Sequence, residues 1–212
     1  MPNHKKTVCV FDFDGTLVDS MDSFIVLAAE VMRDIYQLPV SQGSEAYVKT
    51  SGIPFREQLE IIFPGDCRNP LACQRFESIK KASYLEKEFC EDVGETIGYL
   101  QSKKIKVVVS SSNYQELVEE FLKKKKVRLD LVLGWRPNFS KGRDHFRHVQ
   151  KVLSVTPQSI LFVGDSLKDA ERAEECSIDF IAKTGIFSEK EFRDHFPKVR
   201  VIRSLSELKS YL

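Results

Sequence analysis

Short, nearly continuous apolar runs recur along the chain and predict buried strands. The first run covers residues 7–13 (TVCVFDF), and apolar residues take up a helical spacing after it. Beyond residue 92 such runs alternate with segments of helical spacing. The predicted strands are residues 7–13, 106–109, 130–133, 159–163, 179–182 and 199–202. This alternation predicts an α/β fold, with a parallel sheet covered by helices on both faces.

Apolar residues three or four positions apart predict the helices. In the first helix, which we expect to begin at Ser20, Phe24, Leu27, Val31 and Ile35 share one face. The later predicted helices are residues 54–63, 71–89, 94–103, 114–126, 141–153 and 167–176, with a closing helix from residue 205.

An insertion separates the first strand from the regular alternation. Three predicted helices lie between residues 19 and 92, and Leu38-Pro39 with the Ser/Gly cluster up to Gly43 predicts a loop after the first of them. We therefore expect an inserted helical domain at residues 19–92. The core domain would comprise residues 1–18 and 93–212.

Composition and charge argue against several classes of protein. The 212 residues are 42% hydrophobic and 30% charged, which is typical of a soluble globular protein. The net charge of +1 gives no global attraction to nucleic acid or anionic membranes. The apolar run after the basic residues 1–6 stops at Asp12, too early for a signal segment or a membrane span. Five scattered cysteines without a CxxC pair predict reduced thiols, so we expect a cytoplasmic protein.

Two aspartates lie at the end of the first predicted strand. Asp12 and Asp14 are two residues apart, so their side chains leave an extended backbone on the same side. Two like charges this close at the end of an apolar strand are unfavourable without a compensating cation. Carboxylate oxygens are ligands that Mg²⁺ prefers, so the pair predicts a magnesium site.

Three further polar segments also follow predicted strands. Residues 110–113 (SSSN) lie between a strand and a helix, where hydroxyl and amide groups form anion sites. Lys141 begins a later helix, and Asp165 ends another strand with Asp169 one helical turn beyond it. The carboxyl ends of parallel strands lie along one edge of a sheet, which is where ligands bind. We therefore expect these groups to form one site.

This pattern resembles the haloacid dehalogenase (HAD) superfamily, and in particular its phosphoglycolate phosphatase-like branch. Asp12-Phe13-Asp14-Gly15-Thr16 matches the DxDGT motif, and the following Leu-Val-Asp-Ser is typical of that branch. Ser110 matches the second motif, Lys141 the third, and Asp165–Asp169 the fourth motif, GDxxxD. One departure is Gly142, since family members often have proline after the lysine.

The resemblance spans residues 7–185 and implies a Rossmann-like HAD core with an inserted α-helical cap. It also implies a reaction, in which Asp12 is the nucleophile and forms an aspartyl-phosphate. Asp14 would be the general acid and base. The implied Mg²⁺ ligands are Asp12, the backbone carbonyl of Asp14, and Asp165, with Asp169 ordering metal-bound water.

The same resemblance implies how the phosphate is held. Ser110, the Ser111 amide and Lys141 would bind the phosphoryl oxygens. If Lys141 is not the third-motif cation, Arg143 and Lys151 are the other candidates.

The cap would close over the site and select the substrate. Arg56, which we expect in the first turn of a cap helix, is a possible substrate contact. A covered site suits small phosphorylated metabolites, although the sequence does not identify the ester or the oligomeric state.

Three alternatives to a phosphatase stay open. A sugar phosphomutase of the same superfamily would use the same aspartyl-phosphate and return the phosphoryl group to the sugar. A phospho-receiver module carries similar strand-end groups, although receivers are shorter and the insertion argues against one. A non-enzymatic binding protein is the third alternative.

Overall fold

The computed structural model describes residues 5–212, and the chain forms two compact units. Unit 1 comprises the residues up to Asp19 together with Phe89–Leu212, and unit 2 comprises Ser20–Glu88. Residues 1–4, which begin the basic start of the chain, lie outside the described residues.

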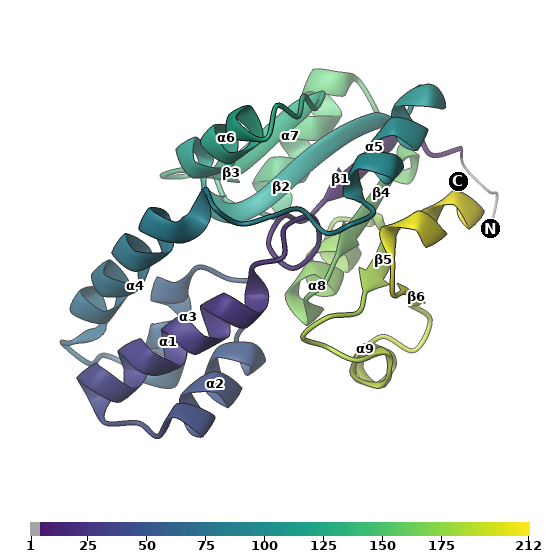
Figure 1. The fold of residues 1–212 in the computed structure, drawn as a ribbon. Coiled ribbons are helices and arrows are strands. Elements are labelled where there is room, and N and C mark those ends of the chain that lie inside the picture. Colours follow the sequence, from purple (N-terminus) through teal and green to yellow (C-terminus); the bar gives the residue numbers. More distant parts are fainter. Residues whose placement is uncertain (1–4) are drawn as a thin grey trace. The chain divides into compact units, whose positions relative to one another are not determined.

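Unit 1 is built on a parallel sheet, which contains six strands within the described residues (Figure 1). The strands are β1 (Val8–Phe11), β2 (Lys106–Tyr114), β3 (Leu131–Trp135), β4 (Ile160–Gly164), β5 (Asp179–Lys183) and β6 (Arg200–Ile202). Their order is β3-β2-β1-β4-β5-β6, and every neighbouring pair is parallel. The central β1 pairs with β2 and β4, and the predicted α/β class is confirmed.

Helices connect the strands of unit 1 and pack on both sides of β1. The helices are α5 (Val93–Ser102), α6 (Gln115–Lys124), α7 (Arg143–Leu153), α8 (Leu167–Glu175) and α9 (Glu189–His195), with 3₁₀ turns at Pro157–Ser159 and Leu205–Ser210. Val8 and Val10 belong to a buried cluster that includes Phe146 of α7 and Ala173 of α8. On the α6 side, Phe13 packs edge to face against Phe121. None of the helices within residues 5–212 combines the length and apolar character needed to cross a bilayer.

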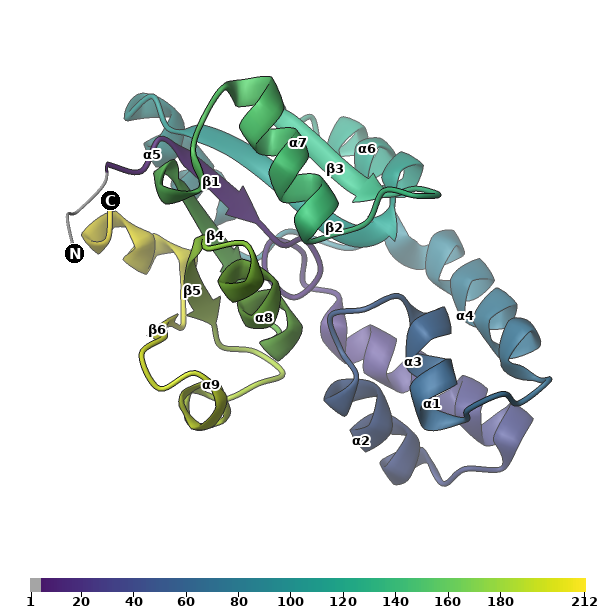
Figure 2. The ribbon, with the colours of Figure 1, turned by 180° about the vertical axis from the view of Figure 1, so that it is seen from behind.

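Unit 2 consists of helices α1 (Met21–Tyr36), α2 (Val40–Lys49), α3 (Phe55–Ile62) and α4 (Asn69–Tyr84), seen from behind in Figure 2. Aromatic side chains form its interior. The rings of Phe55 and Phe76 lie 4.1 Å apart, and the ring of Tyr84 stacks on that of Phe24 at 6.0 Å. Such contacts give a small helical unit a core of its own.

The loop predicted up to Gly43 was wrong, because helix α2 begins directly after Pro39. Proline lacks an N–H, but the first residues of a helix need no intrahelical donor, so Pro39 suits this N-terminal position. Gly43 then lets α2 approach α1 closely, since a Cβ there would lie 3.1 Å from the Cα of Ala29. Pro39 and Gly43, which indicated a loop, therefore begin helix α2 and allow it to pack closely against α1.

Three other elements differ from the prediction. β2 continues to Tyr114, five residues beyond its predicted end at Val109, with an irregular register after Ser110. Helix α9 was not predicted, although Ser188 and Glu191 form a capping box at its start. The closing segment is a 3₁₀ turn at Leu205–Ser210 rather than an α-helix.

Gly134 of β3 lies where the backbone of β3 packs closely against the end of β2 and the start of α6. A Cβ on Gly134 would lie 2.4 Å from the Cα of Gln115 and 2.9 Å from the Asn113 carbonyl oxygen. We expect Gly134→Ala to lower the free energy of unfolding by about 1–3 kcal/mol, measured by urea denaturation. Gly98→Ala is the matched control, because nothing lies within 4 Å of its Cβ. In helix α5 that change should instead stabilise by about 0.5–1 kcal/mol, and equal effects of both substitutions would contradict the packing described.

Candidate active site

Asp12 directly follows β1, at the carboxyl end of the sheet. Its N–H donates to the carbonyl of Val163 at 2.8 Å, which keeps this backbone aligned with β4. The chain then turns at Gly15, whose φ of 81° suits glycine, and the Gly15 N–H donates to the Val18 carbonyl at 2.9 Å. This turn keeps both Asp12 and Asp14 beside the end of the sheet.

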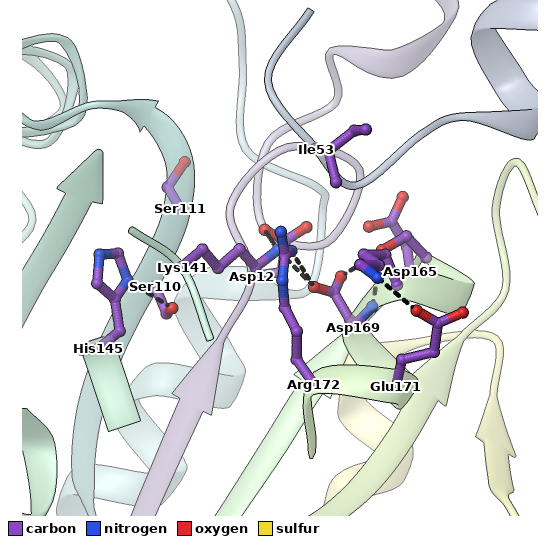
Figure 3. Close-up of polar contacts among 12 residues, drawn as sticks. Asp12, Ile53, Ser110, Ser111, Lys141, His145, Asp165, Asp169, Glu171 and Arg172 are labelled. Carbon is purple, nitrogen blue, oxygen red and sulfur yellow. Dashed lines mark hydrogen bonds and ion pairs between the residues drawn. The ribbon is translucent and has the colours of Figure 1, made fainter. Parts of the chain in front are cut away.

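Lys141 lies between two carboxylates (Figure 3). Its Nζ is 2.5 Å from Asp12 Oδ1 and 2.6 Å from Asp169 Oδ1, and its side chain is 2% exposed. Thr16 Oγ1 is 3.5 Å from Asp12 Oδ2 and donates to Asp165 Oδ1 at 3.2 Å. Asp12, which is the predicted nucleophile, therefore lies close to Lys141 and to both acids of the fourth motif, Asp165 and Asp169.

The start of α8 holds Asp169 in place. The Ser166 hydroxyl accepts from the Asp169 N–H at 3.1 Å and donates to Asp169 Oδ2 at 2.8 Å. Gly164 leaves room for that carboxylate, because a Cβ there would lie 2.6 Å from Asp169 Oδ2. The close approach of Asp169 thus requires glycine at position 164, the last residue of β4.

Burial works against the ionised forms of these acids. It raises the pKa of Asp12 from its ordinary value of 3.8 to about 6, although the charge of Lys141 opposes the rise. Burial also raises the pKa of Asp165 well above its ordinary value, and the charge of Asp12 adds to the effect. For Lys141, burial alone would lower the pKa, but the carboxylates of Asp12 and Asp169 outweigh it and raise the pKa. The group holds more acids than this lysine offsets.

The residues present fit a magnesium site. Ligand oxygens of Asp12, Asp165 and Asp169 lie within 4.8 Å of one another, and all three residues are buried. Mg²⁺ prefers such oxygen ligands, and a divalent cation would offset the excess negative charge. The predicted ligand set of Asp12, Asp14 and Asp165, with Asp169 outside it, stays a prediction.

The end of β2 supplies the other predicted groups. Ser110 and Ser111 are both buried, and the Ser111 hydroxyl accepts from the N–H of Asn113 at 3.0 Å. The side-chain amide of Asn113 donates to Asp14 Oδ2 at 2.8 Å, so it links β2 to the predicted acid and base. Ser110 Oγ lies 2.9 Å from Nδ1 of His145.

Sequence reasoning missed three residues of this site. His145 and Asn113 had signals: His145 follows Lys141 by one helical turn, and Asn113 ends the SSSN segment. Arg172 had none, and its NH1 lies 3.6 Å from Asp169 Oδ1. Its side chain also explains the departure at Gly142, where φ is 107° and a Cβ would lie 3.2 Å from Arg172 Cδ. Proline, whose φ is near −65°, does not fit that backbone.

The remaining candidates lie elsewhere. Arg143 and Lys151, the other candidate cations for the third motif, are exposed, whereas Lys141 is buried against Asp12. Arg56 is an exposed residue in the first turn of α3 in unit 2, and its role in substrate binding stays a prediction.

Comparison with known proteins finds similar sequences over most of the chain. The sequence profile described as haloacid dehalogenase-like hydrolase matches residues 9–183. A phosphoglycolate phosphatase of Synechococcus elongatus is 24% identical over 198 residues, which cover 86% of this chain and 85% of that protein. A haloacid dehalogenase-like hydrolase domain-containing protein of Arabidopsis thaliana is 27% identical over 167 residues, covering 76% of this chain and 63% of that protein.

A solved structure shares the fold. It is that of a protein from Clostridium acetobutylicum described as a predicted phosphatase, and it matches with a TM-score of 0.83 and 20% identity. The match covers 98% of each chain.

The raised pKa values of Asp12 and Asp165 give a testable pH dependence. A carboxyl whose pKa is raised on folding binds its proton more tightly in the folded chain. Metal-free protein therefore loses stability as the pH rises above about 4, through about 6 for Asp12 and through the raised pKa of Asp165. Asp165→Asn removes one charge and keeps an oxygen that can accept from Thr16. In chelating buffer at about pH 7.5, we expect its thermal midpoint to exceed that of the wild type by roughly 2–4 °C per kcal/mol gained.

At about pH 4.5 the two thermal midpoints should converge. Asp165 is then protonated in the folded wild type, so it is neutral like the asparagine of the variant. Differential scanning calorimetry measures both. A wild type that is the more stable protein at the higher pH, without metal, would contradict the charge balance described.

Proposed function

The chain belongs to the haloacid dehalogenase-like hydrolase family, and we propose that it hydrolyses a small phosphate monoester in a magnesium-dependent reaction. One observation carries the proposal: the buried Asp12 carboxylate lies 2.5 Å from Lys141, with two further acids beside it. A carboxylate can approach a phosphate only where positive charge compensates both groups. The similarity to a phosphoglycolate phosphatase also supports phosphate-ester chemistry.

In the proposed reaction Asp12 attacks the phosphorus in line and forms an aspartyl-phosphate, which divides a difficult hydrolysis into two steps. Lys141 contacts Oδ1 of this carboxylate, and Thr16 lies 3.5 Å from Oδ2. These contacts hold the carboxylate in one orientation before the substrate arrives, which favours attack.

Asp14 protonates the leaving alcohol and then takes a proton from the water that cleaves the aspartyl-phosphate. The hydrogen bond from Asn113 to its Oδ2 holds the carboxyl group in position for both transfers. An alkoxide leaving group needs a proton whereas a halide does not. Asp14 therefore favours a phosphate ester over a haloacid as the substrate.

Mg²⁺ would be held by Asp12, the backbone carbonyl of Asp14, and Asp165, with Asp169 ordering the surroundings of the ion. When bound, the ion offsets the negative charge of the transferring phosphoryl group and of the acids. Lys141 contacts both Asp12 and Asp169 and so keeps these two carboxylates at a fixed spacing.

Three groups would bind the phosphoryl oxygens: the Ser110 hydroxyl, the Ser111 amide and the Lys141 ammonium. All three residues are buried, so their hydrogen bonds to an anion form with little competition from water. Hydrogen bonds to a charged group are worth roughly 1.5–3 kcal/mol each.

Unit 2 would act as a cap that selects the substrate, with the exposed Arg56 as a candidate contact to an anionic group. Its helices pack around their own aromatic interior. Surface residues of unit 2 can therefore differ without disturbing the reacting groups of unit 1. A capped site suits a small phosphorylated metabolite.

The proposal is tested by assaying phosphate release from a panel of phosphorylated sugars, nucleotides and small acids, with and without Mg²⁺. We expect release from at least one ester, without a bisphosphate activator, and its loss in chelator. No release from any ester would contradict the proposal. Conversion of a sugar phosphate to its isomer, dependent on a bisphosphate, would assign a phosphomutase instead.

Asp12→Asn should reduce phosphate release by at least roughly a thousandfold, because it removes the nucleophile while keeping the size of the side chain. Steady-state assays on the best ester of the panel measure the effect. Asp194→Asn, an exposed aspartate on α9, is the matched control and should retain wild-type turnover. Wild-type turnover in Asp12→Asn would show that another group is the nucleophile.

Asp14→Asn should slow turnover by about 10²–10⁴-fold, because the first step then lacks a proton donor and the second lacks a proton acceptor. The defect should be smaller for an ester with a phenolate leaving group of low pKa, since that group departs without protonation. Comparing kcat/KM for such an ester and for an alkyl phosphate measures this difference, because kcat/KM reports on the step in which the alcohol departs. An equal loss on both esters would count against Asp14 as the general acid.

A further inference from the structure

His145 is a fully buried ionisable side chain to which the proposed reaction gives no role. It lies on α7, and its Nδ1 is 2.9 Å from Oγ of Ser110 (Figure 3). Ser110 is also fully buried, and it is the residue whose hydroxyl would bind a phosphoryl oxygen. A hydrogen bond between these two side chains therefore acts on a group of the site.

Lys141 and His145 both lie near the start of α7, four residues apart. The ring of Phe139 packs against the imidazole of His145, with centroids 4.7 Å apart and planes tilted by 38°. Phe139 precedes Lys141 by two residues, and α7 begins two residues after Lys141. The start of α7 thus presents an ammonium group to Asp12 and an imidazole to Ser110.

The imidazole of His145 is neutral at ordinary pH. Burial, together with the nearby charge of Lys141, lowers its pKa from 6.5 to about 3. A neutral imidazole carries one N–H, which can be on either nitrogen. Nδ1 therefore either donates to Ser110 Oγ or accepts from its hydroxyl.

These two arrangements have opposite consequences for an anion. A serine hydroxyl has one hydrogen. If Ser110 gives that hydrogen to Nδ1, only its lone pairs remain for the phosphoryl group, and these repel an anion. If Nδ1–H donates to Ser110, the serine hydrogen is left for a phosphoryl oxygen.

We propose that His145 is a positioning residue, whose Nδ1–H donates to Ser110 Oγ and so directs the serine hydroxyl hydrogen to the bound phosphoryl group. The inference rests on the proposed function, since it assigns how one phosphate-binding group of that site is oriented. His145 acts only through Ser110 and does not touch the substrate.

A double-mutant cycle separates this role from mere packing. The variants are Ser110→Ala, His145→Phe and the pair, with binding of inorganic phosphate measured by isothermal titration calorimetry in the presence of Mg²⁺. We expect each single variant to weaken phosphate binding roughly tenfold, about the value of one hydrogen bond to a charged group. The pair should bind no more weakly than Ser110→Ala alone, because both changes remove the same bond.

The matched control is His148→Phe, which changes a second imidazole of α7 that also packs against Phe139, at 5.5 Å. It should bind phosphate as the wild type does. His145→Asn replaces the ring by an amide that can donate from nearly the position of Nδ1, and it should restore binding to within about threefold of the wild type. This variant also keeps the test informative if His145→Phe does not fold.

The proposal would be overturned if the double variant lost as much phosphate affinity as the product of the two single losses. It would also be overturned if His145→Phe bound phosphate as the wild type does. Nitrogen-15 NMR of the phosphate-bound protein gives an independent reading, because it distinguishes a protonated Nδ1 from an unprotonated one. We expect the Nδ1–H form, and an unprotonated Nδ1 would also overturn the proposal. Failure of the proposed function has a different signature: the wild type would bind phosphate yet release none from any ester.

Discussion

The structure depends on one buried ammonium group held between two carboxylates. Lys141 lies 2.5 Å from Asp12 and 2.6 Å from Asp169, and Asp165 adds a third acid to the same group. Burying this many charges is costly unless each is matched, and Lys141 together with the more distant Arg172 does not match three acids. The excess negative charge is the reason that the site suits a divalent cation, and it is also what a phosphate ester must overcome to approach Asp12.

The sheet makes this crowding possible. β1 and β4 are neighbours, so Asp12 and Asp165, which follow them, leave the sheet side by side. Small residues then allow the rest of the group to approach. Gly164 leaves space for the Asp169 carboxylate, and Gly142 adopts a φ of 107° beside the side chain of Arg172. The glycines of the third and fourth motifs are therefore explained by packing around the acids.

Much of the core was predictable because its signals are local. The apolar run of β1 is buried at every position, and the acids after β1 and β4 needed only the rule that parallel strands end at one edge. Helix α2 was missed because Pro39 and Gly43 favour loops locally, and only the contact with Ala29 shows why a helix holds them. The contact between Ser110 and His145 spans 35 residues, so no local pattern reports it.

The central claim is that burial raises the pKa values of Asp12 and Asp165 in the metal-free protein, and that binding of a divalent cation lowers them. Titration of Mg²⁺ into metal-free protein at about pH 6, by calorimetry in buffers of different ionisation enthalpy, measures the protons released on binding. Because burial raises the pKa of Asp12 to about 6 and that of Asp165 well above its ordinary value, binding should release protons to the buffer. Binding without proton release, or no binding of Mg²⁺, would contradict the account.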